Sequence, residues 1–165
     1  STAIKVLHLD DSGLHVSANI SMANPLTVMD WDMRGDSLTV MTVRGLFMEG
    51  VPFSMGHFGG YYKLQQYHLS TTGTLTLLNE AESASPIYTS VRTVHVNDHL
   101  IGVQYQDSNR FQDKVEFIDA DTLQFIGAID IPLDSYILEL NNTSLWLSNG
   151  KSLWQLALPT PATTQ

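Results

Sequence analysis

The sequence predicts an all-β fold built from a repeated unit of four antiparallel strands. Apolar and polar residues alternate with a period of two over most of the chain, for example over 38–43 and 100–105, which is the pattern of half-buried strands. No window of about 11 residues has the apolar spacing of a helix without an interruption by Gly, Pro, Asn or Asp. Segments of similar sequence also recur along the chain, which indicates that the strands form a repeated unit.

Four segments that begin with a lysine and continue as an alternating apolar strand mark this repeat. They are residues 5–9, 63–69, 114–118 and 151–156, and they contain every lysine of the chain. A polar turn and a second apolar strand follow each of the first three; the turns lie at 10–13, 70–73 and 119–122. The recurrence predicts equivalent positions for these four strands.

A predicted hairpin precedes each of the last three lysine-led segments. The hairpins turn at residues 34–36, 97–98 and 141–142, where Asn, Asp and Gly accept the positive φ angles of tight hairpins. If the hairpin strands are called A and B, the lysine-led strand C and its successor D, the chain reads C-D, A-B-C-D, A-B-C-D, A-B-C. A four-stranded unit that recurs every ~40–50 residues is the signature of a β-propeller blade.

Two stretches resemble the repeats of a known group of proteins. Residues 115–132, VEFIDADTLQFIGAIDIP, are similar to the strand-turn-strand repeat of YVTN-type and quinoprotein-like β-propellers, and residues 144–150, SLWLSNG, resemble another element of that superfamily. The resemblance is strong over roughly residues 90–158 and weaker over 4–80, and with the strand repeat it implies a propeller-like repeat domain over 1–158. The Pro- and Thr-rich composition of 159–165 is typical of a disordered tail or linker. The resemblance implies no activity, because these families include enzymes, scaffolds and sensors. No recognisable cofactor-binding set accompanies it, so no cofactor is expected.

The chain holds about three blades, whereas closed propellers have ~4–8. An open arc of three blades would leave apolar sheet faces exposed at both ends. We therefore expect either a homo-oligomer, in which two copies complete a ring, or association with the remainder of a larger propeller chain. The alternative fold is a single closed β-barrel with a central cavity.

Composition excludes several classes of function. The net charge is −9, with 17 acidic and 8 basic residues, and the basic residues are dispersed, so no nucleic-acid partner is expected. No apolar run reaches the ~18 residues of a membrane-spanning helix. The chain has no cysteine and thus neither a disulfide nor a thiolate metal site. The compartment stays open, and a periplasmic or secreted location is compatible with the composition.

The long connections are the predicted binding sites. In a four-stranded meander the A-B and C-D turns lie on one edge, whereas the B-C and D-A connections, which are long here, lie on the other. Long loops on a rigid scaffold collect binding residues. The candidates are Phe53, Met55, His57, Phe58 and Tyr61 in the first B-C connection and Arg110 and Phe111 in the second. The competing interpretation is a loop that packs on itself or forms a subunit contact.

These features favour a non-catalytic binding or assembly module for a protein or small-molecule partner. The alternative function is a hydrolase or lyase that uses Asp30 and Asp32, which share one face of an A strand near the propeller axis, together with His57. Solvated channel-lining acids are the simpler interpretation of these two aspartates. His95 and His99 flank a tight turn, so their side chains should diverge, and no metal site is expected.

Overall fold

The computed structural model describes residues 3–21, 26–45, 59–83, 87–88, 91–107 and 111–158. These residues form 14 strands and no helix, so the predicted all-β class is confirmed. Accordingly, the described ranges contain no helix that could cross a membrane. The predicted tail at 159–165 lies outside the described residues.

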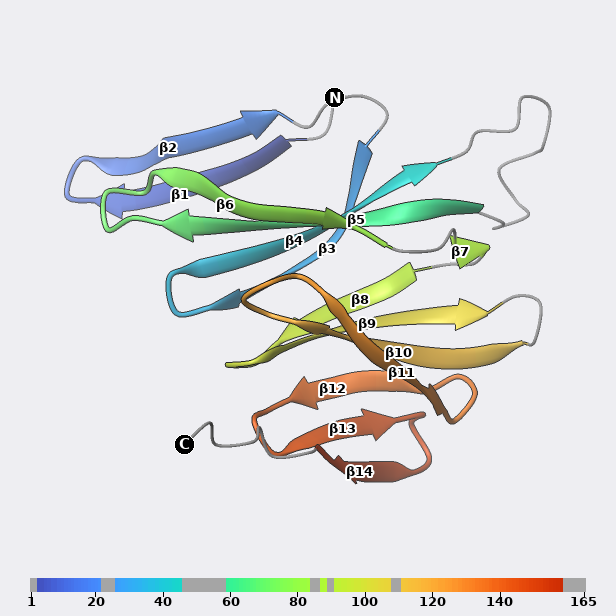
Figure 1. The fold of residues 1–165 in the computed structure, drawn as a ribbon. Coiled ribbons are helices and arrows are strands. Elements are labelled where there is room, and N and C mark those ends of the chain that lie inside the picture. Colours follow the sequence, from blue (N-terminus) through green and yellow to red (C-terminus); the bar gives the residue numbers. More distant parts are fainter. Residues whose placement is uncertain are drawn as a thin grey trace, which may run out of the picture.

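Four antiparallel sheets follow one another along the chain (Figure 1). The first contains β1 (Ala3–Asp10) and β2 (Gly13–Ser21). The second contains β3 (Leu26–Arg34), β4 (Ser37–Gly45), β5 (Gly59–Leu69) and β6 (Leu75–Glu82), and the short β7 (Ile87–Tyr88) pairs with β5. The third contains β8 (Val91–Val96), β9 (Leu100–Asp107), β10 (Gln112–Asp119) and β11 (Phe125–Ile131). The fourth contains β12 (Tyr136–Leu140), β13 (Ser144–Ser148) and β14 (Leu153–Ala157).

The strand order within the sheets matches the repeat read from the sequence. Apart from β7, each strand pairs with its neighbour in the chain, and the four sheets have the C-D, A-B-C-D, A-B-C-D and A-B-C composition. The lysine-led segments supply β1, β5, β10 and β14, and the last three are the third strands of their sheets. The described residues form no closed barrel, so the alternative fold finds no support, while ring formation stays a proposal.

The A-B and C-D turns lie along one edge of the molecule (Figure 1). The A-B turns and the C-D turns at 10–13, 70–73 and 119–122 are on this edge, opposite the strand ends that lead into the longer connections. Gly35 has a φ of 56°, as the hairpin prediction required. The Asn turns close differently, because Asn97 Oδ1 accepts hydrogen bonds from the backbone N–H groups of His99 and Leu100, and Asn141 Oδ1 accepts those of Thr143 and Ser144. These asparagines act through side-chain hydrogen bonds and not through positive φ.

The apolar core is divided into three clusters between successive sheets. Leu38, Val40 and Tyr67 pack against the partly buried Ile4 and Ile20 of the first sheet. A second cluster joins the second sheet to the third and includes Met41, Tyr62, Leu64, Val94, Ile101, Val103, Ile118 and Leu123. A third cluster joins the third sheet to the fourth and contains Val115, Ile131, Ile137, Leu140, Leu145 and Leu147. The third sheet is therefore packed on both faces, and the second sheet is packed on both faces except along β3, where Trp31 and Met33 stay exposed.

The first strands of the sheets form a row through the stack. β3 packs against β8, and β8 packs against β12. Their A-B turns are also joined by polar contacts: Arg34 forms an ion pair with Asp98, and the Asp98 backbone N–H donates to Asn142 Oδ1 at 3.0 Å. Asn97 Nδ2 donates to the Asn141 carbonyl at 2.8 Å. The sheets thus stack along their first strands.

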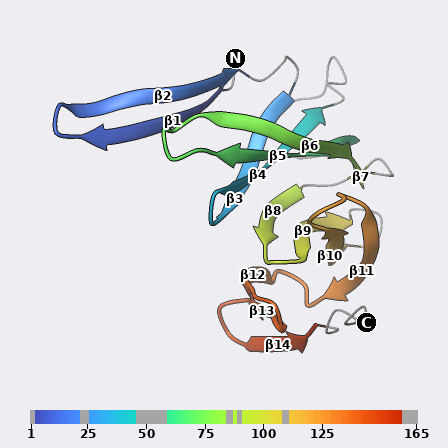
Figure 2. The same cartoon turned by 60° about the vertical axis from the view of Figure 1, so that its left-hand side comes forward.

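The two end sheets expose apolar side chains, as expected for an open arc. The β1–β2 ribbon and the β12–β14 sheet lie at opposite ends of the stack (Figure 2). In the ribbon, Leu7 lies opposite Val16 and Leu9 opposite Leu14, so the four side chains share one face. Ile4 and Ile20 pack on the second sheet, which places the exposed four on the outer face. At the other end Tyr136, Leu138 and Leu153 are exposed.

Candidate functional site

Most of the loop residues predicted to bind a partner lie outside the described residues. These are Phe53, Met55, His57, Phe58 and Arg110. The backbone of Tyr61 belongs to β5, opposite Arg44 of β4, but its side chain is not described. Phe111 precedes β10 with 76% of its surface exposed and a φ of 51°. Whether these side chains form one site therefore stays a prediction.

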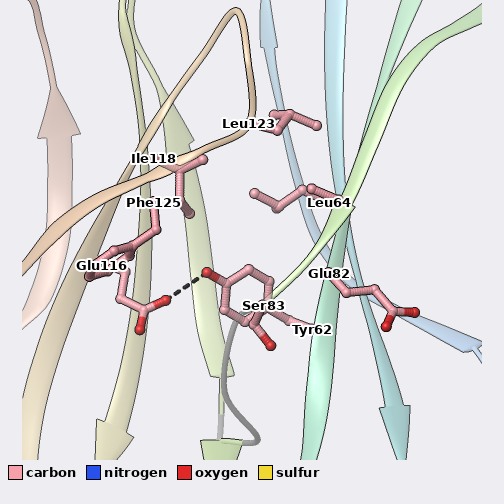
Figure 3. Close-up of a pocket in the computed structure, with 9 residues that line it drawn as sticks. Tyr62, Leu64, Glu82, Ser83, Glu116, Ile118, Leu123 and Phe125 are labelled. Carbon is pink, nitrogen blue, oxygen red and sulfur yellow. Dashed lines mark hydrogen bonds between the residues drawn. The ribbon is translucent and has the colours of Figure 1, made fainter.

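A pocket of about 190 Å³ lies between the second and third sheets (Figure 3). It is lined by Tyr62 and Leu64 of β5, by Ala81 and Glu82 of β6 with Ser83, by Glu116 and Ile118 of β10, by Leu123 of the β10–β11 turn and by Phe125 of β11. Tyr62 and Ser83 lie toward the long connections, whereas Leu123 lies in a tight turn on the opposite edge, so the lining extends from one edge toward the other. The pocket is our candidate site.

One end of this pocket is apolar. Leu64, Ile118 and Leu123 gather there in Figure 3, and all three are buried. Leu123 adopts a φ of 57°, and its backbone N–H donates to the Asp119 carbonyl at 2.9 Å. This tight turn between β10 and β11 brings the Leu123 side chain over the pocket, in a left-handed conformation that a residue with a Cβ adopts only when packing supports it.

The other end carries a buried tyrosine and a carboxylate. The Tyr62 hydroxyl donates to Glu116 Oε2 at 2.6 Å (Figure 3). Burial of the ring raises the pKa of Tyr62 above its usual value, and the neighbouring Glu116 carboxylate raises it further. Tyr62 is therefore a neutral donor at any physiological pH. Glu82 points away from this pair, and Ser83 is held by its backbone N–H bond to the Tyr62 carbonyl.

The described residues of the lining carry only acidic charge. Their ionisable carboxylates are Glu82 and Glu116, and none of these described residues is a lysine, arginine or histidine. The lysines closest in sequence are engaged elsewhere: Lys63 pairs with Glu80 at 2.7 Å and Lys114 with Asp130 at 2.8 Å. The pocket thus combines an apolar end with a carboxylate that accepts hydrogen bonds and attracts positive charge.

Sequence reasoning missed both polar residues of this pair. The only signal was the position of Glu116, which shares one face of β10 with Ile118 while Val115 packs into the opposite cluster. A charged residue in a strand covered on both faces needs a partner. Its partner Tyr62 lies 54 residues earlier in the chain, and nothing local predicts their contact.

The aspartates assigned to the catalytic alternative join two sheets. Asp30 Oδ2 accepts the Val94 backbone N–H at 2.8 Å, and Asp32 Oδ2 accepts that of Val96 at 2.8 Å. Asp32 Oδ1 also accepts the Met33 N–H. Both carboxylates therefore accept hydrogen bonds from N–H groups along the outer edge of β8 and have a structural role. The third residue of the catalytic alternative, His57, lies outside the described residues.

The two histidines beside the β8–β9 turn differ in environment. His95 is half-buried, its Nε2 has no hydrogen-bond partner among the described residues, and burial lowers its pKa despite the opposing effect of Asp32 and Asp30. His99 is exposed. Within the part of the chain that the structure describes, no group of three or more His, Asp or Glu side chains could hold a metal ion.

Comparison of the chain with protein-family models, with curated proteins and with solved structures found no match.

Proposed function

We propose that this chain is a non-catalytic binding and assembly module of the β-propeller type, and that its long-connection edge receives a partner. The A-B-C-D order of the sheets and the row of first strands β3, β8 and β12 support the propeller arrangement. Such stacks leave one edge for long loops, and rigid scaffolds with variable loops commonly serve as binding surfaces.

The pocket beside Tyr62 and Glu116, between the second and third sheets, indicates what kind of group the module binds. Its carboxylates attract a cation, while Leu64, Ile118 and Leu123 provide contact for an apolar stem. Its volume of about 190 Å³ is smaller than the ~300 Å³ at which pockets for drug-sized ligands begin. The proposed guest is therefore an ammonium group on a short apolar stem, such as a lysine side chain of a partner protein. The Tyr62–Glu116 pair at the pocket is the observation on which this proposal depends.

Small ammonium ions test this binding directly. n-Butylammonium and benzylammonium should shift the NMR signals of Tyr62 and Ile118 in a saturable way, whereas n-butanol and benzyl alcohol should bind at least about tenfold more weakly. Glu116→Gln should remove this preference for the cation. The matched control is Glu139→Gln, which changes an exposed carboxylate on β12.

Equal binding of the alcohols and the ammonium ions would contradict the proposed guest. So would an unchanged preference in the Glu116→Gln variant, provided that its spectrum shows an intact fold.

The apolar end faces favour assembly as a second role. Leu7, Leu9, Leu14 and Val16 are exposed on one end, and Tyr136, Leu138 and Leu153 on the other. Contiguous apolar patches on a soluble domain mark interaction surfaces. The partner is either a further copy of this chain or the remainder of a larger propeller chain.

Light-scattering mass as a function of protein concentration tests the assembly role. The unchanged chain should associate or aggregate, and the paired substitutions Leu9→Lys and Leu14→Glu should reduce this association. A compact monomer at high concentration, with no difference between the two proteins, would contradict the assembly role.

A further inference from the structure

In the part of the chain that the structure describes, β1 pairs with a strand on one side only. In the second and third sheets the lysine-led strand pairs on both sides: β5 with β4 and β6, and β10 with β9 and β11. β1 is the equivalent lysine-led strand, yet its only partner among the described residues is β2. No described strand stands beside β1 where A and B strands stand in the other sheets.

A groove of about 390 Å³ occupies this position. β1 contributes Ile4, Lys5 and Val6, and the second sheet contributes Trp31 and Met33 of β3, Leu38 and Val40 of β4, with Leu69 and Leu75. Trp31 is 59% exposed and Met33 40% exposed. The groove is therefore an apolar surface beside a free strand edge, and unpaired edges accept added strands.

The alternation along β3 shows what belongs in the groove. Asp30 and Asp32 turn to one side of the strand, where they hold β8. Trp31 and Met33 turn to the other side, because successive residues of a strand point to opposite faces. The row of first strands β12, β8 and β3 thus ends with a face of β3 that another first strand would cover. Such a strand would pack on β3 as β3 packs on β8 and β8 packs on β12.

On this basis we infer that the groove binds a β-hairpin from outside these 165 residues. The second hairpin strand adds antiparallel to β1, and the first covers Trp31 and Met33, which completes a four-stranded sheet. This inference rests on the proposed propeller stacking. β-Strand addition of this kind obtains affinity from backbone hydrogen bonds and specificity from the side chains that enter the groove.

A second copy of the chain does not supply this hairpin. Each A-B hairpin of the structure already carries its own third strand: β3–β4 carries β5, β8–β9 carries β10, and β12–β13 carries β14. A docked copy would place its third strand where β1 lies. The occupant is consequently a hairpin whose second strand has a free edge.

The probe is a hairpin with the sequence of residues 91–106, closed by a disulfide between cysteines added at its two ends. This sequence has the A-B pattern and no tryptophan, so the Trp31 indole signal reports on the groove. Saturable binding should shift the Trp31 indole signal and slow hydrogen exchange of β1 amides by at least about tenfold. Met33→Lys should abolish both effects, whereas Leu153→Lys at the far end of the stack should leave them unchanged.

The inference is wrong if the Trp31 signal does not shift at millimolar probe concentration. It is also wrong if the probe binds to β14 or to the outer face of β1–β2, or if the protein forms a stable dimer in which Trp31 is already covered. Nuclear Overhauser contacts between β3 and β8, recorded on the same sample, separate the two proposals. If those contacts are present and the probe does not bind, the hairpin inference fails alone; if they are absent, the stacking proposal fails with it.

Discussion

At the scale of single residues, the contacts between sheets are polar at the first strands and apolar elsewhere. Asp30 and Asp32 each accept a backbone N–H of β8, and these N–H groups lie on an edge of β8 that no described strand pairs with. A carboxylate that accepts an N–H bond is a charge-assisted acceptor, stronger than a neutral one. Acidic residues near the centre of this stack therefore stabilise its structure.

Removal of either aspartate should loosen the join between the second and third sheets. Asp30→Ala and Asp32→Ala should each lower the free energy of unfolding by about 1–3 kcal/mol, the usual range for losing a charged acceptor. The exposed Asp11→Ala is the control. Urea titration measures the change, and hydrogen exchange at Val94 and Val96 locates it. Equal exchange at these two amides in all variants would contradict the assigned contacts.

His95 should make the fold less stable in mild acid. Burial lowers its folded-state pKa below the unfolded value of about 6.5, so the unfolded chain binds the proton more readily. Its unfavourable contribution is absent above pH ~6.5 and grows as the pH falls toward the lowered pKa. His95→Gln should reduce the drop in melting temperature between pH 7.5 and 5.5. The substitution His99→Gln, at an exposed position, should leave this drop unchanged. If the melting temperature falls by the same amount in both variants, the role assigned to His95 is wrong.

At the scale of elements, the recurring lysine has a structural explanation. Lys63 of β5 pairs with Glu80 of β6, and Lys114 of β10 pairs with Asp130 of β11. In both sheets the third strand is thus linked to the fourth by an ion pair. Each pair is worth only ~0–1 kcal/mol at a surface. The recurring lysine made the four segments recognisable in the sequence, but its ion pair contributes little to the free energy of unfolding.

The docking of the first ribbon depends on a glycine in the β5–β6 turn. Gly73 has a φ of 80°, and a Cβ there would lie 2.3 Å from Ser17 Oγ of β2. Gly150 has the same φ with no atom within 4 Å of such a Cβ, so Gly150→Ala measures the backbone strain alone. Gly73→Ala should destabilise the protein by more than Gly150→Ala and speed exchange selectively in β1 and β2.

Ser17→Gly in the Gly73→Ala background should restore most of the difference, because it removes the side chain that clashes. If the two alanine variants lose equal stability, the ribbon does not lie against this turn.

Strand identity and order were predictable from the sequence because they depend on local chemistry. The period-two pattern, Gly35 in its hairpin and the lysine-led segments all act within one sheet. The stacking of the sheets depends on distant partners such as Tyr62 and Glu116, which carry no local signal. The candidate site could therefore not be predicted from the sequence, and the predicted binding role of the long connections stays a prediction. Positive φ at Asn97 and Asn141 was wrong, because a side-chain acceptor closes those turns equally well.

At the scale of the whole molecule, stability should decrease from the middle of the stack to its ends. Apart from Trp31 and Met33 on β3, the second and third sheets are packed on both faces, whereas the outer faces of the β1–β2 ribbon and the β12–β14 sheet are open. Native-state hydrogen exchange should give the highest protection in β4, β5, β9 and β10, and the lowest in β2 and β14. Uniform protection across all four sheets would contradict this gradient.

The stack of separate sheets is tested most directly by nuclear Overhauser spectroscopy on the isotope-labelled chain. The account predicts cross-strand Hα–Hα contacts only within the four sheets, together with contacts from Asp30 and Asp32 to Val94 and Val96. A continuous ladder of Hα–Hα contacts joining β2 to β3, β6 to β8 or β11 to β12 would instead describe one sheet, and it would contradict the account.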